Sequence, residues 1–166
     1  QINVRTKDEK ITIPEASGLF LASEENLIIP FNLDAEGVSI NYATAQLLTR
    51  VGPETKPCFV FFTPEGTKAE FSISRTNVRK ISGSTIKVDS NTKRQLVRCP
   101  DNSEFKVEKK SGGEIRILVI SKEKARKSWL LKIHGNKYLA FSDATLLQND
   151  KGIEFRSTGS NTFDLA

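Results

Sequence analysis

Residues 58–66 read Cys-Phe-Val-Phe-Phe-Thr-Pro-Glu-Gly, and this stretch decides the class of fold. The apolar run from Cys58 predicts a strand that is buried on both faces and extends to Thr63. Pro64-Glu65-Gly66 follows at once and is typical of a turn, because proline and glycine interrupt regular structure. A strand of this kind needs other strands beside it and a layer on each side.

The sequence on either side of this run supplies many more short strands. Apolar residues alternate with polar ones in several runs, which is the period of a half-buried strand; the clearest are Val38-Ile40-Tyr42, Phe71-Ile73, Ile86-Val88 and Phe105-Val107. Two hairpins have good turn signatures, at Lys110–Gly113 and at Gly135-Asn136. We therefore predict an all-β fold, either a β-sandwich or paired small β-subdomains of many short antiparallel strands, with one or two short helices.

The first helix is expected from about Lys122 to Trp129. Ser121 can cap its N-terminus, and Ala125 and Trp129 lie four residues apart on one face. A second helical turn is expected at Asp143–Leu147, with Ser142 as its cap.

The length of 166 residues suits one compact domain, residues 1–166. The polar stretch 77–102 has the weakest pattern, so we also consider a subdivision near residue 80, into 1–80 and 81–166. No apolar run is long enough to span a bilayer. The chain has no Met and opens on Gln1 without an apolar leader, which favours a processed or excised piece of a longer protein.

The net charge of +5 raises the hypothesis of a nucleic-acid-binding β-domain. The basic residues are dispersed, however, and their densest cluster, Lys122–Lys127, is interrupted by Glu123. A solvated basic face explains this pattern better, so we expect no nucleic-acid partner.

The two cysteines, Cys58 and Cys99, lack the spacing of a zinc site, and His134 is the one histidine that could join them. We expect no metal and no cofactor. Cys58 lies in the apolar run and is expected to be a buried free thiol, although a disulfide to Cys99 stays open if the protein is exported.

No catalytic apparatus is visible in the sequence. A glycosidase needs two positioned carboxyl groups, and the nearest candidate pair is Glu65 and Glu70. We interpret these two as a turn residue and a residue on the solvent face of a strand. His134 stands before a hairpin turn and has no supporting nucleophile motif. We therefore predict that this chain is not an enzyme by itself.

Sugar binding would use aromatic faces, and Trp and Tyr serve this purpose better than Phe. The two candidate platform residues for carbohydrate are Tyr42, on an alternating strand, and Trp129, on the expected helix. Packing within its own domain is the better interpretation for each of them.

Two segments carry a family resemblance through the order and spacing of their motifs. The first runs from Ile29-Pro30-Phe31-Asn32 through Tyr42-Ala43-Thr44-Ala45-Gln46 to the aromatic strand and Glu65-Gly66. The second runs from Ile117–Ser121 through Ala125–Trp129 and Tyr138-Leu139 to Ser142–Leu147. Together they span about residues 10–155 and resemble the β-rich region that follows the catalytic barrel in family 35 glycoside hydrolases (β-galactosidases).

The resemblance implies a non-catalytic accessory β-domain of a β-galactosidase-type hydrolase. Its implied partner is the (β/α)8 barrel of the same parent chain, and it would help to shape the glycan-binding cleft. A barrel takes about 250 residues and cannot fit in this chain, so no residue here inherits a catalytic role. The resemblance also implies a periplasmic or extracellular location. We expect no membrane partner, because no apolar run is long enough to span a bilayer. The alternative is an independent carbohydrate-binding module.

Overall fold

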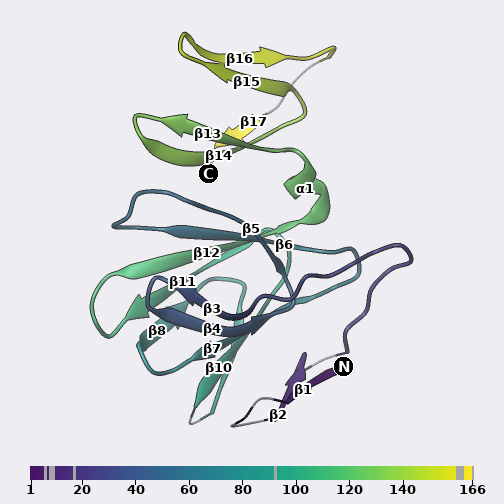
Figure 1. The fold of residues 1–166 in the computed structure, drawn as a ribbon, viewed down its shortest axis with the longest axis vertical. Helices are drawn as coiled ribbons and strands as arrows, with labels where there is room; N and C mark the ends of the chain where they lie inside the picture. Colours follow the sequence, from purple (N-terminus) through teal and green to yellow (C-terminus); the bar gives the residue numbers. More distant parts are fainter. Residues whose placement is uncertain (6, 8–9, 17, 92, 160–162, 166) are drawn as a thin grey trace.

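Figure 1 shows the computed structural model, which describes residues 1–5, 7, 10–16, 18–91, 93–159 and 163–165. The described residues form seventeen strands and one short helix, α1. The prediction of an all-β fold is therefore confirmed. Among the described residues there is no helix that is both long enough and apolar enough to cross a membrane.

Two five-stranded sheets form the body of the molecule. The strands of the first sheet, in spatial order, are β3 (Phe31–Ala35), β4 (Val38–Ala43), β7 (Ala69–Ser74), β10 (Arg94–Cys99) and β9 (Lys87–Ser90). Those of the second are β5 (Gln46–Val51), β6 (Cys58–Thr63), β12 (Glu114–Ser121), β11 (Ser103–Lys109) and β8 (Val78–Ser82). Neighbouring strands are antiparallel except β6 and β12, which pair in parallel at the centre of the second sheet.

The two sheets face each other across an aromatic core. Phe71 of the first sheet lies edge-on between Phe61 and Phe105 of the second, with ring centroids 5.1 and 5.4 Å apart. Edge-to-face packing is the favoured arrangement of aromatic rings. The apolar residues of the alternating strands supply the rest of this core, so the molecule contains a β-sandwich.

The strand Cys58–Thr63 is buried on both faces, as predicted. Phe59 and Phe61 point into the sandwich core, whereas Cys58 and Val60 belong to a second cluster with Leu139 and Phe141. This second cluster joins the sandwich to the C-terminal strands, which stack above β5 and β6 in Figure 1.

The C-terminal part consists of two small sheets after α1 (Lys122–Arg126). One contains β13 (Ser128–Ile133), β14 (Asn136–Ser142) and β17 (Phe163–Leu165); the other contains β15 (Thr145–Asn149) and β16 (Gly152–Arg156). Figure 1 shows the second of these as the outermost layer. At the opposite end of the molecule, β1 (Ile2–Arg5) and β2 (Lys10–Ile13) form a hairpin whose Ile11 and Ile13 pack on Tyr42.

The helix prediction is right in its start and wrong in its end. Ser121 caps α1, and its hydroxyl oxygen accepts a hydrogen bond from the Lys124 N–H at 3.2 Å. The helix ends at Arg126, and Trp129 lies on β13, opposite Ala140 of β14. The strand ladder with β14 outweighs the local helical spacing of Ala125 and Trp129.

The second expected helical turn, at Asp143–Leu147, is also wrong. Thr145 to Leu147 belong to β15, which pairs with β16. Ser142 does bind a nearby N–H, that of Ala144 at 3.0 Å, but it does so in a turn between strands. Serine serves both structures because its hydroxyl accepts from a backbone N–H two or three residues ahead.

Both large sheets contain strands from before and after residue 80. A boundary at this position would cut both sheets, so we propose that residues 31–121 act as one unit. We propose the junction of β12 with α1, at Ser121-Lys122, as a better place for a subdivision.

Candidate functional site

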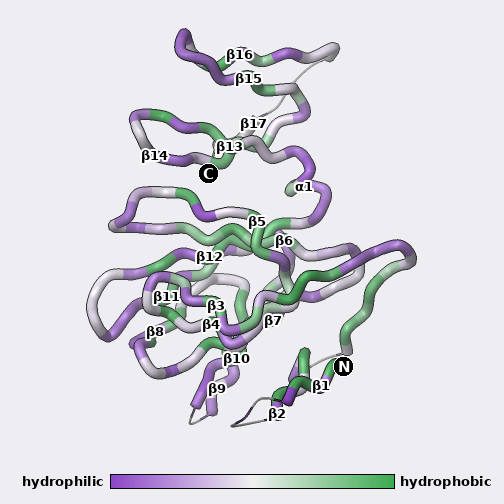
Figure 2. The backbone as a smooth tube through the Cα atoms, viewed as in Figure 1, coloured by the Kyte–Doolittle hydropathy of each residue, from purple (hydrophilic) through white to green (hydrophobic). Residues whose placement is uncertain are grey.

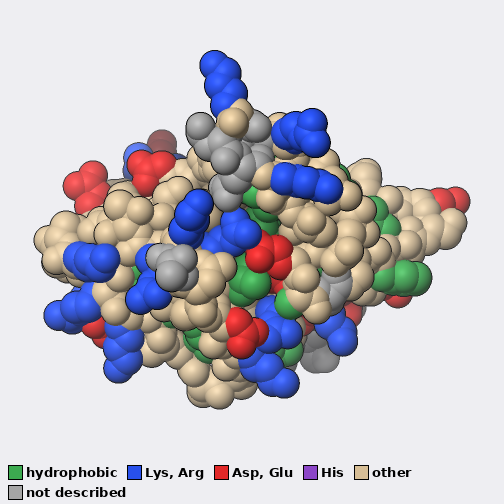
Figure 3. All heavy atoms as spheres, turned by 90° about the horizontal axis from the view of Figure 1, so that it is seen from below, with side chains coloured by type: hydrophobic (Ala, Val, Ile, Leu, Met, Phe, Trp, Pro, Cys, Tyr) green, Lys and Arg blue, Asp and Glu red, His purple; other side chains and the backbone are tan. Residues whose placement is uncertain are grey.

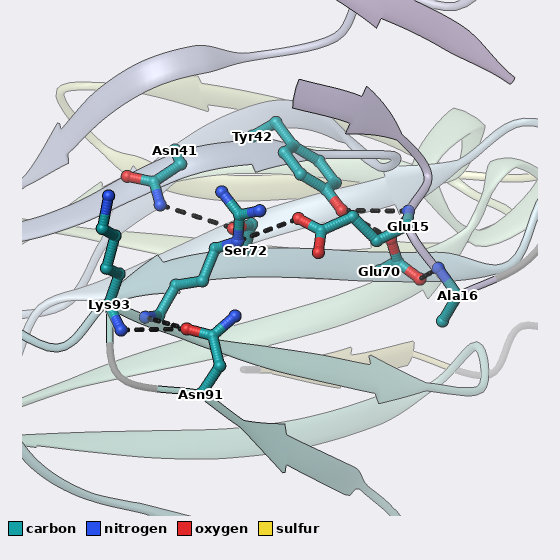
Figure 4. Close-up of polar contacts among 9 residues, drawn as sticks. Glu15, Ala16, Asn41, Tyr42, Glu70, Ser72, Asn91 and Lys93 are labelled. Carbon is teal, nitrogen blue, oxygen red and sulfur yellow. Dashed lines mark hydrogen bonds and ion pairs between the residues drawn. The ribbon is translucent and has the colours of Figure 1, made fainter. Parts of the chain in front are cut away.

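The most strongly buried charged side chain of the described residues is Glu70 on β7, with 1% of its surface exposed. Figure 4 shows its carboxylate pointing at the ring of Tyr42 and at the backbone after β2. The Tyr42 hydroxyl donates a hydrogen bond to Glu70 Oε1 at 2.6 Å. The N–H groups of Glu15 and Ala16 donate to Oε1 and Oε2 at 2.7 and 3.1 Å.

The local sequence explains why Glu70 is held so firmly. Thr44 follows β4, and its hydroxyl accepts from the Glu70 N–H at 2.8 Å and donates to the Lys68 carbonyl at 2.7 Å. The pairing of β4 with β7 shifts register between Ile40 and Tyr42, which is typical of a β-bulge. This arrangement places the Tyr42 hydroxyl against Glu70 rather than in solvent.

The electrostatics of this cluster keep Tyr42 neutral. Burial raises the pKa of its hydroxyl far above the usual value, and the hydrogen bond to Glu70 and the charge of Glu70 raise that pKa further. The phenol therefore stays a donor to the carboxylate. A buried carboxylate is costly unless donors surround it, and here three donors do so.

This cluster is a structural contact and lacks the layout of a glycosidase site. Such a site needs two carboxyl groups about 5–10 Å apart on either side of an open substrate position. Glu70 is enclosed, Glu65 is exposed on the turn after β6, and the Glu15 carboxylate pairs with Arg94 at 3.0 Å. The expected solvent-face position of Glu70 is wrong, because the segment after β2 covers this face of β7.

The two predicted sugar-platform residues lie far apart in the fold. Tyr42 is on β4 with 0% of its surface exposed, so its ring offers no face to a sugar, which corrects our expectation for this residue. Trp129 is half-buried on β13, packs with the cluster around Leu131, and donates its indole N–H to the Ser142 carbonyl at 3.4 Å. A sugar contact at Trp129 stays a prediction.

The remaining candidates are not brought together. His134 lies in the hairpin turn between β13 and β14, far along the chain from both cysteines. Cys58 and Cys99 are buried free thiols, as expected for Cys58, and burial raises the pKa of each to about 11. In the part of the chain that the structure describes, no group of three or more His, Cys, Asp and Glu side chains could hold a metal ion.

Sequence reasoning missed a basic hollow beside the Glu70 cluster. Its volume is about 660 Å³, and four of its lining residues are cationic, namely Arg75, Lys93, Arg94 and Lys110. Asn41, Ser74 and Thr76 complete the lining. The cations come from the turn after β7, the start of β10 and the hairpin after β11. No local run in the sequence therefore indicates that they lie together.

Comparison with known proteins identifies relatives of this chain. The family model described as "Beta-galactosidase, domain 2" matches residues 1–128. A protein named "Probable beta-galactosidase B", from Emericella nidulans, is 25% identical over 154 residues, covering 89% of this chain. The chain spans 15% of the length of that relative.

Proposed function

Because this chain belongs to the β-galactosidase domain 2 family, we propose that it is a non-catalytic accessory domain that packs on the catalytic barrel of a β-galactosidase-type hydrolase. The family match over residues 1–128 carries this proposal. The absence of an open carboxylate pair around Glu70 and Glu65 supports it. A separate part of the parent protein would then carry out hydrolysis. The resemblance also implies that the parent protein is located outside the cytoplasm.

The segment 18–30 is our candidate for the surface that faces the barrel. It has no regular secondary structure, and Figure 2 shows two hydrophobic stretches on either side of a polar tip. Phe20 and Ile28 have 64% and 72% of their surface exposed. Two large apolar side chains that are this exposed on one segment are expected where a partner covers the surface.

Three contacts hold this segment against the sandwich. The Thr67 hydroxyl donates to the Phe20 carbonyl at 2.8 Å, and the Gln46 side chain donates to the Asn26 carbonyl at 3.3 Å. Lys122 pairs with Glu25. The apolar side chains are thus presented from an anchored backbone, which lowers the entropy cost of packing on a partner.

The test compares full-length parent enzymes. Phe20→Ser combined with Ile28→Ser should speed the thermal loss of β-galactosidase activity, because the interface with the barrel loses apolar contact area. Leu130→Ser combined with Leu147→Ser is the matched control, since these leucines are 51% and 39% exposed on the C-terminal sheets. Equal inactivation rates for both pairs would contradict the proposed surface.

A second measurement tests the non-catalytic role. The purified 166-residue chain should leave nitrophenyl β-galactoside intact, whereas the parent enzyme should hydrolyse it. Turnover by the purified chain would overturn the proposal.

The alternative, an independent carbohydrate-binding module, loses one of its two platform residues through the burial of Tyr42. It still predicts retention on neutral glycans that depends on Trp129. A Trp129→Ala variant on a glycan array decides it.

A further inference from the structure

We propose that the basic hollow between the turn after β7 and the start of β10 binds an anionic glycan. The restriction to a glycan rests on the proposed function. The anion preference rests on the hollow itself. Seen from below, this end of the molecule displays many Lys and Arg side chains and fewer Asp and Glu (Figure 3).

Backbone contacts fix the rim of the hollow. The Lys110 ammonium donates to the carbonyls of Arg75 and Thr76 at 3.0 and 3.1 Å. The Arg75 guanidinium donates to the Asn91 carbonyl at 2.8 Å, and the Arg75 N–H donates to the Lys93 carbonyl at 3.1 Å. The turns that carry Arg75 and Lys93 are therefore tied to each other, and Lys110 is tied to the first of them, so the cations stay close together before any ligand arrives.

The Asn91 side chain organises the second of these turns. Its Oδ1 accepts from the N–H groups of Lys93 and Arg94, both at 2.9 Å. Figure 4 shows the Lys93 side chain extending from this turn towards Asn41. Lys93 thus reaches across from the β10 side towards β4.

The charge of the hollow is poorly compensated. Arg94 pairs with Glu15, but Arg75, Lys93 and Lys110 form no ion pair with any carboxylate in the described ranges. The lining likewise contains no Asp or Glu among the described residues. Clustered cations of this kind attract an anion, and charge-assisted hydrogen bonds from Arg and Lys to anionic oxygens are the strong ones.

The size and polarity of the hollow favour a sugar acid over a lone ion. Its volume of about 660 Å³ lies within the range of small-molecule sites. Ser74, Thr76 and Asn41 offer neutral hydrogen-bonding groups suited to sugar hydroxyls. No aromatic side chain lines the described hollow, so stacking of a neutral sugar is not its mode of binding.

The experiment measures binding of a short oligogalacturonate to the 166-residue chain by calorimetry. Neutral galactotriose, sodium sulfate and an acidic peptide are the comparison ligands. We expect the oligogalacturonate to bind most tightly, and its affinity to fall as salt screens the charges. Lys93→Glu should weaken this affinity by about tenfold or more, because a charge-assisted hydrogen bond becomes a repulsion.

Lys137→Glu is the matched control. It makes the same change of charge at an exposed position on β14 and should leave the affinity unchanged. Circular dichroism of both variants verifies that the fold is kept, as expected for exposed side chains.

Each unfavourable outcome is decisive. Equal loss in the two variants would overturn the site, and equal binding of galactotriose would overturn the anion preference. Binding of sulfate or of the acidic peptide at least as tightly as the oligogalacturonate would overturn the glycan class. None of these results bears on the accessory role, which the full-length enzyme tests separately.

Discussion

Glu70 illustrates how one residue can tie distant segments together. Its carboxylate holds the backbone of Glu15 and Ala16, more than fifty residues earlier in the chain, and the Tyr42 hydroxyl closes the same cluster. The segment after β2 is thereby attached to the sandwich. In the sequence, Glu70 alternates with Phe71 and Ile73 and looks like any solvent-facing strand residue. Its burial depends on a covering segment that no local pattern reveals.

Glu70→Gln should lower the free energy of unfolding by about 2–4 kcal/mol, because an amide can accept fewer hydrogen bonds and one buried N–H loses its acceptor. Denaturant unfolding measures this change, and amide hydrogen exchange should accelerate at Glu15 and Ala16. Glu65→Gln removes the same charge at the exposed turn and should change stability by less than about 0.5 kcal/mol. Similar losses in the two variants would contradict the role of Glu70.

The two cysteines make a pH-dependent contribution to the free energy of unfolding, which is also an effect of single residues. Burial raises the pKa of Cys58 and Cys99 to about 11, from 9.0 for an unperturbed thiol. In the unfolded chain the thiols ionise first, so their contribution to stability is complete below about pH 9 and is lost as the pH rises towards 11. A Cys58→Ala and Cys99→Ala double variant should show a shallower fall of stability over this window.

Thiol titration gives an independent check of the same burial. At pH 8 the folded chain should react with a thiol reagent far more slowly than the chain in denaturant. Rapid labelling of both thiols in the folded chain would contradict it.

At the scale of the element, the presence of a hairpin turn was predicted correctly, but the two residues that form its loop were not. The hairpin between β13 and β14 is present, but Ile133 pairs with Asn136, so the two loop residues are His134 and Gly135. Both have positive φ, 48° and 81°, as a type I′ turn requires. The predicted loop pair, Gly135-Asn136, is therefore displaced by one residue from the observed pair. Histidine is uncommon at the first loop position, and the pairing of the two strands, not the local sequence, places it there.

His134→Asn should therefore stabilise the protein by a few tenths to about 1 kcal/mol, since asparagine tolerates positive φ better than histidine. Thermal or denaturant unfolding measures the gain. His134→Val should act in the opposite direction, because a β-branched residue at positive φ is strained. If both variants destabilised equally, the turn geometry would not be the cause. If the proposed accessory role is right, the parent enzyme carrying His134→Asn should also keep its full activity.

At the scale of the molecule, the layers could be anticipated only in part. The apolar run at Cys58–Thr63 required cover on both faces, and the structure supplies the sandwich core on one side and the C-terminal sheets on the other. The identity of the second layer was not predictable, because it depends on residues such as Leu139 and Phe141 that follow a helix and a change of direction. The basic hollow was missed for the same reason: its cations meet only after three turns have been placed.

Leu139 is the residue through which we expect the C-terminal sheets to be coupled to the sandwich. It is 2% exposed and packs in the cluster with Val60 and Ile120, while the Lys137 carbonyl beside it accepts from the Gly52 N–H at 3.0 Å.

Leu139→Ala should lower the free energy of unfolding by about 2–4 kcal/mol, because the cavity lies between two parts that cannot collapse onto each other. We expect the unchanged 166-residue chain to unfold in one calorimetric transition, and Leu139→Ala to unfold in two, with the C-terminal sheets melting first. Leu130→Ala is the matched control, since Leu130 faces Leu139 in register but is 51% exposed, and it should keep one transition with a loss below about 1 kcal/mol. One unbroken transition in Leu139→Ala would mean that α1 and the backbone contact of Gly52 suffice to couple the two parts.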